Sequence, residues 1–281
     1  MRVLLVLVPT LAVTATAAWL LIGGPVALLV SGVVTTSTCG LLALAVASPR
    51  SQWIVPSLHR GSGGTPALAL TFDDGPDPRY TPRVLQLLAA HGARATFFVV
   101  GQRAEQHPEL VRAIAAAGHQ IGSHSYTHGP RFHFQRSASM AADIRAGVDV
   151  LAAILGRVPL AFRPPLGLRV PHLREALRLC GLPLTCVTWT ARGADAVRRP
   201  PAAILARLLP ALRPGAILTL HDGAGLGGSD DREPTLAALA DLLPAIATRG
   251  LACVRLEELP CQKPWPAWQE CRPDAQERTV S

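Results

Sequence analysis

Residues 67–100 read ALALTFDDGPDPRYTPRVLQLLAAHGARATFFVV, and this stretch decides the fold class. It begins with an apolar run at 67–72 that is typical of a buried β-strand. Thr81 and Pro82 then cap and begin a helix with one apolar face, which a glycine ends before a second β-rich run at 96–100. Because strands joined by a helical crossover lie parallel, the stretch predicts one β–α–β unit.

The same order of helix, glycine and strand returns along the rest of the chain. Strands are predicted at residues 67–72, 96–100, 120–123, 160–162, 184–189, 216–220 and 251–256. Seven strands alternating with helices predict an α/β fold and favour a barrel over an open sheet, although periodicity alone does not distinguish the two. Polar residues directly after several strands strengthen the barrel interpretation, because the carboxyl-end rim of such barrels carries the active site.

The charge of the chain argues against one class of partner. The formal net charge is +8, and three arginines without any acidic residue lie within residues 1–60. The remainder contains no dense run of Lys and Arg with interleaved aromatic residues. We therefore expect no nucleic-acid partner.

Two motifs after predicted strands contain side chains that bind metals. Asp73 and Asp74 lie in TFDDGP, where one carboxylate can bind a cation while its neighbour accepts a proton, although such a sequence is also a common turn. His124 and His128 lie in HSYTH, and their rings meet on one face if the segment forms a helical turn. Imidazole and carboxylate suit zinc, and three protein ligands with an open fourth position define a catalytic zinc site.

Three further polar groups are expected at the same rim. Arg163 begins RPPLG, whose two prolines fix the backbone so that the Leu166 amide can point into the site, with a structural ion pair of Arg163 as the alternative. His221 in LHDG follows the strand at 216–220 and suits a general acid. Asp195 follows Trp189 closely and completes the set.

The ordered set TFDDGP, HSYTH, RPPLG, Trp189 to Asp195, and LHDG resembles the polysaccharide deacetylase family with the NodB-homology domain. The resemblance covers about Ala67 to Leu259. It implies a distorted seven-stranded (β/α) barrel and a divalent metal, usually zinc. It also implies a hydrolase that removes N-acetyl groups from amino-sugar residues of a peptidoglycan, chitin-like or exported glycan.

The resemblance also assigns roles to residues that match the family's motifs. The metal ligands would be Asp74, His124 and His128. Asp73 would be the catalytic base, oriented by Arg163, and His221 the acid that protonates the departing amine, tuned by Asp195. The backbone amide of Leu166 would stabilise the oxyanion.

Two positions depart from the family pattern. Ala196 stands where the family usually has tryptophan, and Thr219 where an aliphatic residue is usual. Both would face the acetyl methyl group, so we expect a wider and wetter acyl pocket. Two alternatives therefore stay open: a deformylase or O-acyl esterase acting on a lipid-linked saccharide, and a catalytically weak glycan-binding protein on the same fold.

The amino end is expected to be a membrane anchor. No charged residue occurs from Val3 to Pro49, and two apolar stretches, Val3–Ile22 and Val26–Ala47, flank a Gly-Gly-Pro turn. About 20 apolar residues cross a bilayer, so one or two membrane helices fit. A cleaved secretory signal is the alternative, but the second stretch exceeds the apolar core of a signal, about 7–15 residues.

These features predict a bacterial cell-membrane protein whose catalytic domain is extracytoplasmic. Two spans would instead place Arg2, Arg50 and Arg60 on the cytoplasmic side, so the topology stays open.

The predicted divisions are an anchor at 1–50, a linker at 51–66, the catalytic domain at 67–260 and an irregular tail at 261–281. Cys261 and Cys271 in the tail could pair if it is extracytoplasmic.

Overall fold

A computed structural model describes residues 11–261 except 12, 15, 18, 22, 226 and 227. Its strands are β1 Ala67–Asp73, β2 Ala95–Val99, β3 Gln120–Ser123, β4 Ala161–Phe162, β5 Thr185–Cys186, β6 Ala191–Arg192, β7 Ile217–His221 and β8 Ala252–Cys253. They pair in parallel in the order β5-β4-β3-β2-β1-β7-β6, and β8 pairs with the first two residues of β1. The seven-strand path curls into an incomplete barrel, which confirms the predicted fold class.

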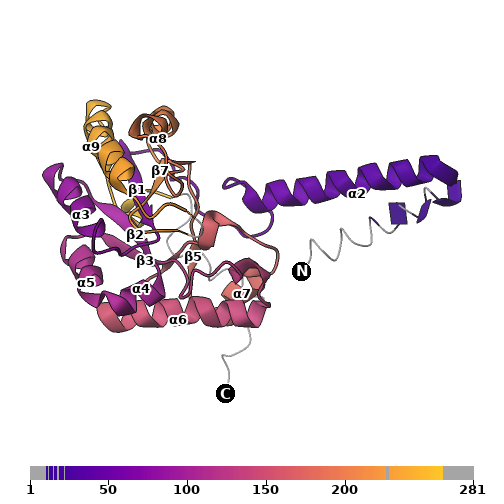
Figure 1. The fold of residues 1–281 in the computed structure, drawn as a ribbon, viewed down its shortest axis with the longest axis horizontal. Coiled ribbons are helices and arrows are strands. Elements are labelled where there is room, and N and C mark those ends of the chain that lie inside the picture. The colour runs from indigo at the N-terminus through magenta and orange to yellow at the C-terminus, as the bar shows by residue number, and fades with distance from the viewer. Residues whose placement is uncertain are drawn as a thin grey trace, which may run out of the picture.

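Helices cover the outside of this curled sheet (Figure 1). They are α3 Thr81–Ala90, α4 Gly101–Gln106, α5 Pro108–Ala116, α6 Ser137–Leu155, α7 Leu173–Cys180, α8 Pro201–Leu208 and α9 Glu233–Thr248. Short 3-10 turns are η1 Phe132–Phe134, η2 Pro165–Gly167, η3 Leu209–Ala211 and η4 Leu256–Glu258. Three predicted strands, β4, β5 and β8, are shorter than expected. Strand β6 is not predicted from the sequence pattern, because two residues are too few to show a period.

Strand β1 lies inside the sheet, between β2 and β7, and is buried along its whole length. Leu68, Leu70 and Phe72 pack in the core between the sheet and its helices. Because side chains alternate across a strand, Thr71 and Asp73 share the opposite, inward face. The Asp73 carboxylate therefore points into the barrel at the carboxyl end of β1.

A gap remains between the edge strands β5 and β6, and the chain preceding β1 spans part of it, from Val187 after β5 to Ala216 before β7. Leu58 forms a parallel bridge with Val187, and Arg60 forms an antiparallel bridge with Ala216. The Leu58 amide donates to the Cys186 carbonyl at 2.9 Å. Part of the segment predicted as a linker thus adds backbone hydrogen bonds to the barrel, while the domain boundaries themselves stay a prediction.

Helix α2, Gly24–Ala47, projects from the barrel as a long apolar rod (Figure 1). It is the one helix among the described residues that is long and apolar enough to cross a membrane. Its last two turns pack Leu42, Ala45 and Val46 against the core cluster beside α6 and α7. Most of the first predicted apolar stretch, and the Cys271 half of the predicted disulfide, lie outside the described residues.

Candidate active site

The carboxyl ends of the strands open into one pocket with a volume of about 280 Å³. Six of the predicted site residues line it: Asp73, Asp74, His124, His128, Leu166 and His221. Arg163 and Asp195 are buried directly behind this wall, each bonded to a residue that lines it. The structure therefore brings all eight predicted side chains and amides to one rim.

Asp74, His124 and His128 form a group that can hold a metal ion. Their candidate ligand atoms lie within 4.8 Å of one another. The His124 Nδ1 donates to the Arg163 carbonyl at 2.7 Å, so Nε2 is the ring nitrogen that can face a metal. Burial, with a smaller effect of His124, lowers the pKa of His128 to about 3, so this imidazole is neutral. Its Nε2 is buried without a hydrogen bond, and together these features fit a divalent cation.

The histidine segment does not form the helical turn that would have explained the spacing. Ser125 and His128 instead have left-handed backbones, with φ of 68° and 46°, and the two histidine rings still approach to 4.6 Å between centroids. Asp143 on α6 holds the loop by accepting the Tyr126 amide at 2.9 Å and the Thr127 hydroxyl at 2.6 Å. Sequence reasoning missed this supporting carboxylate, because it lies in a regular helix without a motif.

Asp73 is paired with a fully buried arginine. The Arg163 Nη1 donates to the Asp73 carboxylate at 2.5 Å and to the Thr71 hydroxyl at 2.8 Å, and Nη2 donates to the Thr188 carbonyl at 3.0 Å. The guanidinium also stacks over the Phe98 ring at 4.1 Å. Such contacts fix one orientation of the Asp73 carboxylate.

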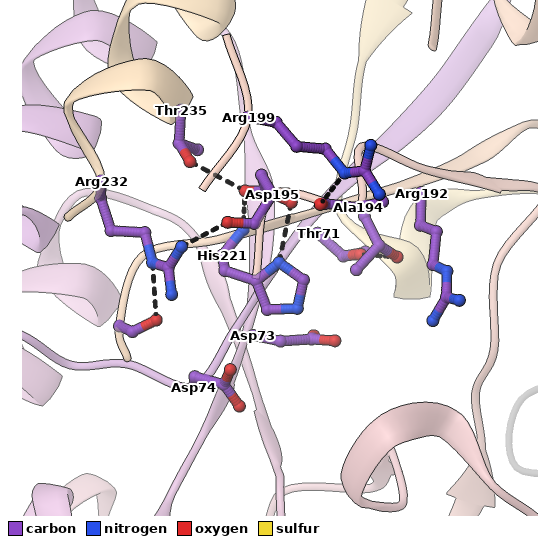
Figure 2. A network of polar contacts seen from close by, with 12 residues as sticks. Thr71, Asp73, Asp74, Arg192, Ala194, Asp195, Arg199, His221, Arg232 and Thr235 are labelled. Atoms are coloured by element: carbon purple, nitrogen blue, oxygen red, sulfur yellow. Dashed lines mark hydrogen bonds and ion pairs between the residues drawn. The ribbon is translucent and has the colours of Figure 1, made fainter. Parts of the chain in front are cut away.

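His221 is held in the same way by a second carboxylate. Its Nδ1 lies 2.8 Å from the Asp195 Oδ1, and its backbone amide donates to Oδ2 at 2.9 Å. Thr235 donates to the same Oδ2 at 2.9 Å. Burial alone would lower the pKa of His221, but the charge and hydrogen bond of Asp195 raise it to about 9. Figure 2 shows the His221 ring between Asp195 and the pair Asp73 and Asp74.

Leu166 lies in η2 with a left-handed backbone, at φ 55° and ψ 2°. Its amide makes no hydrogen bond to another described residue, and the residue lines the pocket. Gly167 beside it packs so closely on Trp189 that an added Cβ would lie 2.1 Å from the indole. This contact holds the turn in place and leaves the Leu166 amide available.

The two residues that depart from the family pattern both line the pocket. Thr219 is fully buried and its hydroxyl lies 3.0 Å from the Thr71 hydroxyl. Arg192 and Arg199 also line the pocket, and sequence reasoning did not single them out. Three arginines between 192 and 199 were the available signal, but only the fold shows which of them face the site.

Comparisons with known proteins agree with this geometry. A model of the polysaccharide deacetylase family matches residues 60–185. A chitooligosaccharide deacetylase of Sinorhizobium fredii is 37% identical over 204 residues, covering 69% of this chain and 92% of the relative. The chain belongs to the polysaccharide deacetylase family.

Two further similar proteins show that membership of the polysaccharide deacetylase family does not by itself establish catalytic activity. A peptidoglycan-N-acetylglucosamine deacetylase of Bacillus cereus is 33% identical, over 74% of this chain and 91% of the relative. A solved pseudoenzyme of carbohydrate esterase family 4 from Bacillus anthracis has a TM-score of 0.62 at 25% identity, covering 72% of this chain and 67% of that one. The glycan deacetylase class follows from the relatives, whereas turnover depends on the residues in the pocket.

Proposed function

We propose that the chain is a membrane-anchored, zinc-dependent deacetylase that hydrolyses the N-acetyl group of an amino sugar. One observation carries this proposal: two different proton-handling pairs, Asp73 with Arg163 and His221 with Asp195, flank a single metal-binding triad in one pocket. Amide hydrolysis needs a base that takes a proton from the attacking water and an acid that protonates the departing amine. Both groups must reach the same bound substrate.

Asp74, His124 and His128 would hold the metal. Zinc at such a site supplies a Lewis acid that lowers the pKa of water to about 7 and polarises the acyl carbonyl. The buried carboxylate and two imidazoles match the nitrogen and oxygen ligands that zinc prefers, and three ligands leave a position open.

Asp73 would take the proton from the attacking water. Side chains alternate between the two faces of β1, so Asp73 points into the barrel. The ion pair with Arg163 holds its carboxylate in the pocket that contains the metal-binding triad. Because Arg163 contacts Asp73 from behind, it orients the base without touching the substrate.

His221 would donate a proton to the departing amine. A general acid must be protonated before it acts, and the Asp195 contact keeps the imidazole cationic at neutral pH. Thr235 and the buried Arg232 hold Asp195 in turn, since Arg232 donates to its backbone carbonyl.

The Leu166 amide would donate to the oxygen that becomes negative during attack. It lines the pocket and no other described residue accepts its hydrogen. A preformed N–H donor of this type stabilises a developing oxyanion without reorganising.

Helix α2 supports attachment to a membrane, with the catalytic domain on the extracytoplasmic face where exported glycans are found. It spans 24 residues, and its most apolar stretch of 18 residues has a mean hydropathy of 1.9 and is almost entirely exposed. An exposed apolar surface of this length has no favourable environment in water.

The test is acetate release from N-acetylglucosamine oligomers by the detergent-solubilised full chain. It should be measured with zinc, with other divalent ions, and after chelation. We expect release that chelation abolishes and zinc restores. A folded, zinc-loaded chain that releases no acetate would contradict the proposal.

A second candidate is a different acyl group, because Ala196 and Thr219 leave the acyl end of the pocket less apolar than the family pattern. Rates should be compared for N-acetyl, N-formyl and O-acetyl forms of one sugar. Ala196→Trp should then raise the preference for N-acetyl over N-formyl by about tenfold, since an indole offers the methyl group an apolar contact. An unchanged ratio would show that position 196 does not set the acyl preference. Binding without hydrolysis of any form would favour the glycan-binding alternative.

A further inference from the structure

Two arginines form part of the pocket wall beside the proposed catalytic groups. Arg192 ends β6, and Arg199 follows seven residues later, before α8. Both line the pocket that contains Asp73 and His221 (Figure 2). Neither forms an ion pair with a carboxylate of the described residues, although seven other arginines do.

Both guanidinium groups are held in position by contacts that leave hydrogen-bond donors free. The Arg199 Nε donates to the Ala194 carbonyl at 2.9 Å, and no described residue accepts from its two terminal nitrogens. The Arg192 guanidinium lies over the Trp189 ring, 5.4 Å from its centroid. Stacking of this kind uses the face of the guanidinium and leaves its N–H edge for a ligand.

The backbone between the two arginines is also fixed. The Ser229 amide donates to the Ala196 carbonyl at 3.1 Å. Arg232, which is 1% exposed, donates to the Asp195 carbonyl from the other side. The two cationic side chains therefore project from a held segment rather than from a free loop.

No carboxylate among the described residues that line the pocket remains to neutralise this charge. Asp73 is paired with Arg163, and Asp74 belongs to the metal-binding triad. The third carboxylate close by, Asp195, is engaged by His221 and Thr235. A neutral N-acetylglucosamine chain offers no countercharge to two guanidinium groups, whereas phosphate and carboxylate oxygens match their planar donor geometry.

We propose that Arg192 and Arg199 form an oxyanion subsite, and that the substrate is an acylated amino sugar carrying a phosphate or carboxylate next to the acylated ring. This inference rests on the proposed function, because it names the substrate class of the same pocket. The subsite would bind the anion while the acyl group lies at the triad.

The direct test compares substrates that differ only in the anion. One N-acetylglucosamine disaccharide would be assayed in its neutral form, with a phosphate on the reducing end, and with a carboxylate in place of the reducing-end hydroxymethyl group. We expect kcat/KM to be about tenfold or more higher for an anionic form, mainly through KM, because charge-assisted hydrogen bonds are stronger than neutral ones. Preference for one anion identifies which of the two the subsite binds. Equal kcat/KM for all three forms would overturn the proposal.

Variants assign the preference to the two side chains. Arg192→Gln and Arg199→Gln should each reduce the ratio of anionic to neutral kcat/KM by about tenfold, and raised salt should reduce it in the parent chain. Arg198→Gln is the matched control, because Arg198 is exposed and does not line the pocket. A ratio that falls equally in the control would contradict the assignment.

A binding measurement separates this inference from the deacetylase proposal. Calorimetry would compare glucosamine phosphate with glucosamine, using the full chain and both glutamine variants. If no substrate is hydrolysed but the phosphate form binds more tightly in an arginine-dependent way, the subsite stands and the deacetylase proposal fails. If acetate is released without any anion preference, the deacetylase proposal stands and the subsite fails.

Discussion

Asp73 and Asp74 are neighbours in the chain, but their side chains point in different directions and contact different partners. Asp73 continues the strand and points inward to Arg163. Asp74 has a left-handed backbone, with φ of 71°, and lies 3.4 and 3.2 Å from the Nε2 atoms of His124 and His128. This turn of the chain separates the proposed base from the proposed ligand.

The separation predicts different consequences for substituting the base and a ligand. Asp73→Asn should retain bound zinc and lower kcat by about 10²- to 10⁴-fold, because an amide cannot accept the proton. His124→Ala should lose both zinc and turnover. Metal content of the purified variants and initial rates of acetate release are the measurements. Full activity of Asp73→Asn would show that another group is the base.

The second residue-scale prediction concerns pH. Against the effect of burial, Asp195 raises the pKa of His221 to about 9, so the acid stays protonated until the pH approaches that value. We expect kcat/KM of the parent chain to fall as pH rises through about 9. In Asp195→Asn the cation loses its main stabilising charge, its pKa falls, and the alkaline limb should move to lower pH. Profiles of kcat/KM between pH 5 and 10 test this, and an unmoved limb would assign it to another group.

At the scale of elements, one buried arginine joins helix α2 to the catalytic domain. The guanidinium of Arg169, which is fully buried, donates to the carbonyls of Ser48 and Ser51 just after the helix, and the Arg169 amide donates to Val46 within its last turn. A cation beside a helix C-terminus also interacts favourably with the helix dipole. Arg169 follows η2 in sequence, so the turn that carries Leu166 leads directly into this junction.

Removing this contact should destabilise the junction. Arg169→Ala would leave the partly buried carbonyls of Ser48 and Ser51 without this donor, and full burial of such an unsatisfied group would cost about 1–3 kcal/mol. Thermal unfolding in detergent should therefore occur at a lower temperature than in the parent chain. Arg157→Ala is the control, because Arg157 is exposed and has no contact of this kind. Equal shifts in the two variants would contradict the junction role.

At the scale of the whole molecule, the barrel depends on chain that precedes its first strand. Val55 is fully buried in the cluster that contains Cys186, and Leu58 supplies backbone hydrogen bonds at the gap beside Val187. These residues lie outside the part of the sequence that resembles the family.

Two truncations test this dependence. Removal of residues 1–47 should leave a folded barrel, whereas removal of residues 1–65 should expose the edges at Val187 and Ala216 and lower the melting temperature further. Thermal unfolding of both forms, with zinc present, is the measurement. Equal melting temperatures would show that the gap needs no closing segment.

The sequence by itself determined the parallel fold and the side chains of the candidate site. Apolar runs separated by helices predict parallel strands, and the carboxyl ends of parallel strands share one rim, so Asp73, His124 and His221 had to converge. Both inferences depend on local sequence patterns, which can be recognised without knowledge of long-range contacts.

Tertiary structure alone decided the rest. Contacts with distant parts of the chain impose three features that local preference does not favour. These are the two-residue strand β6, the left-handed turns at Ser125 and His128, and the bridge at Leu58. The same holds for Arg192 and Arg199, which line the pocket and which sequence cannot distinguish from Arg198, which does not line it. Whether an arginine faces solvent or substrate depends on strand register and on the loops packed behind it, and these form only when the whole barrel assembles.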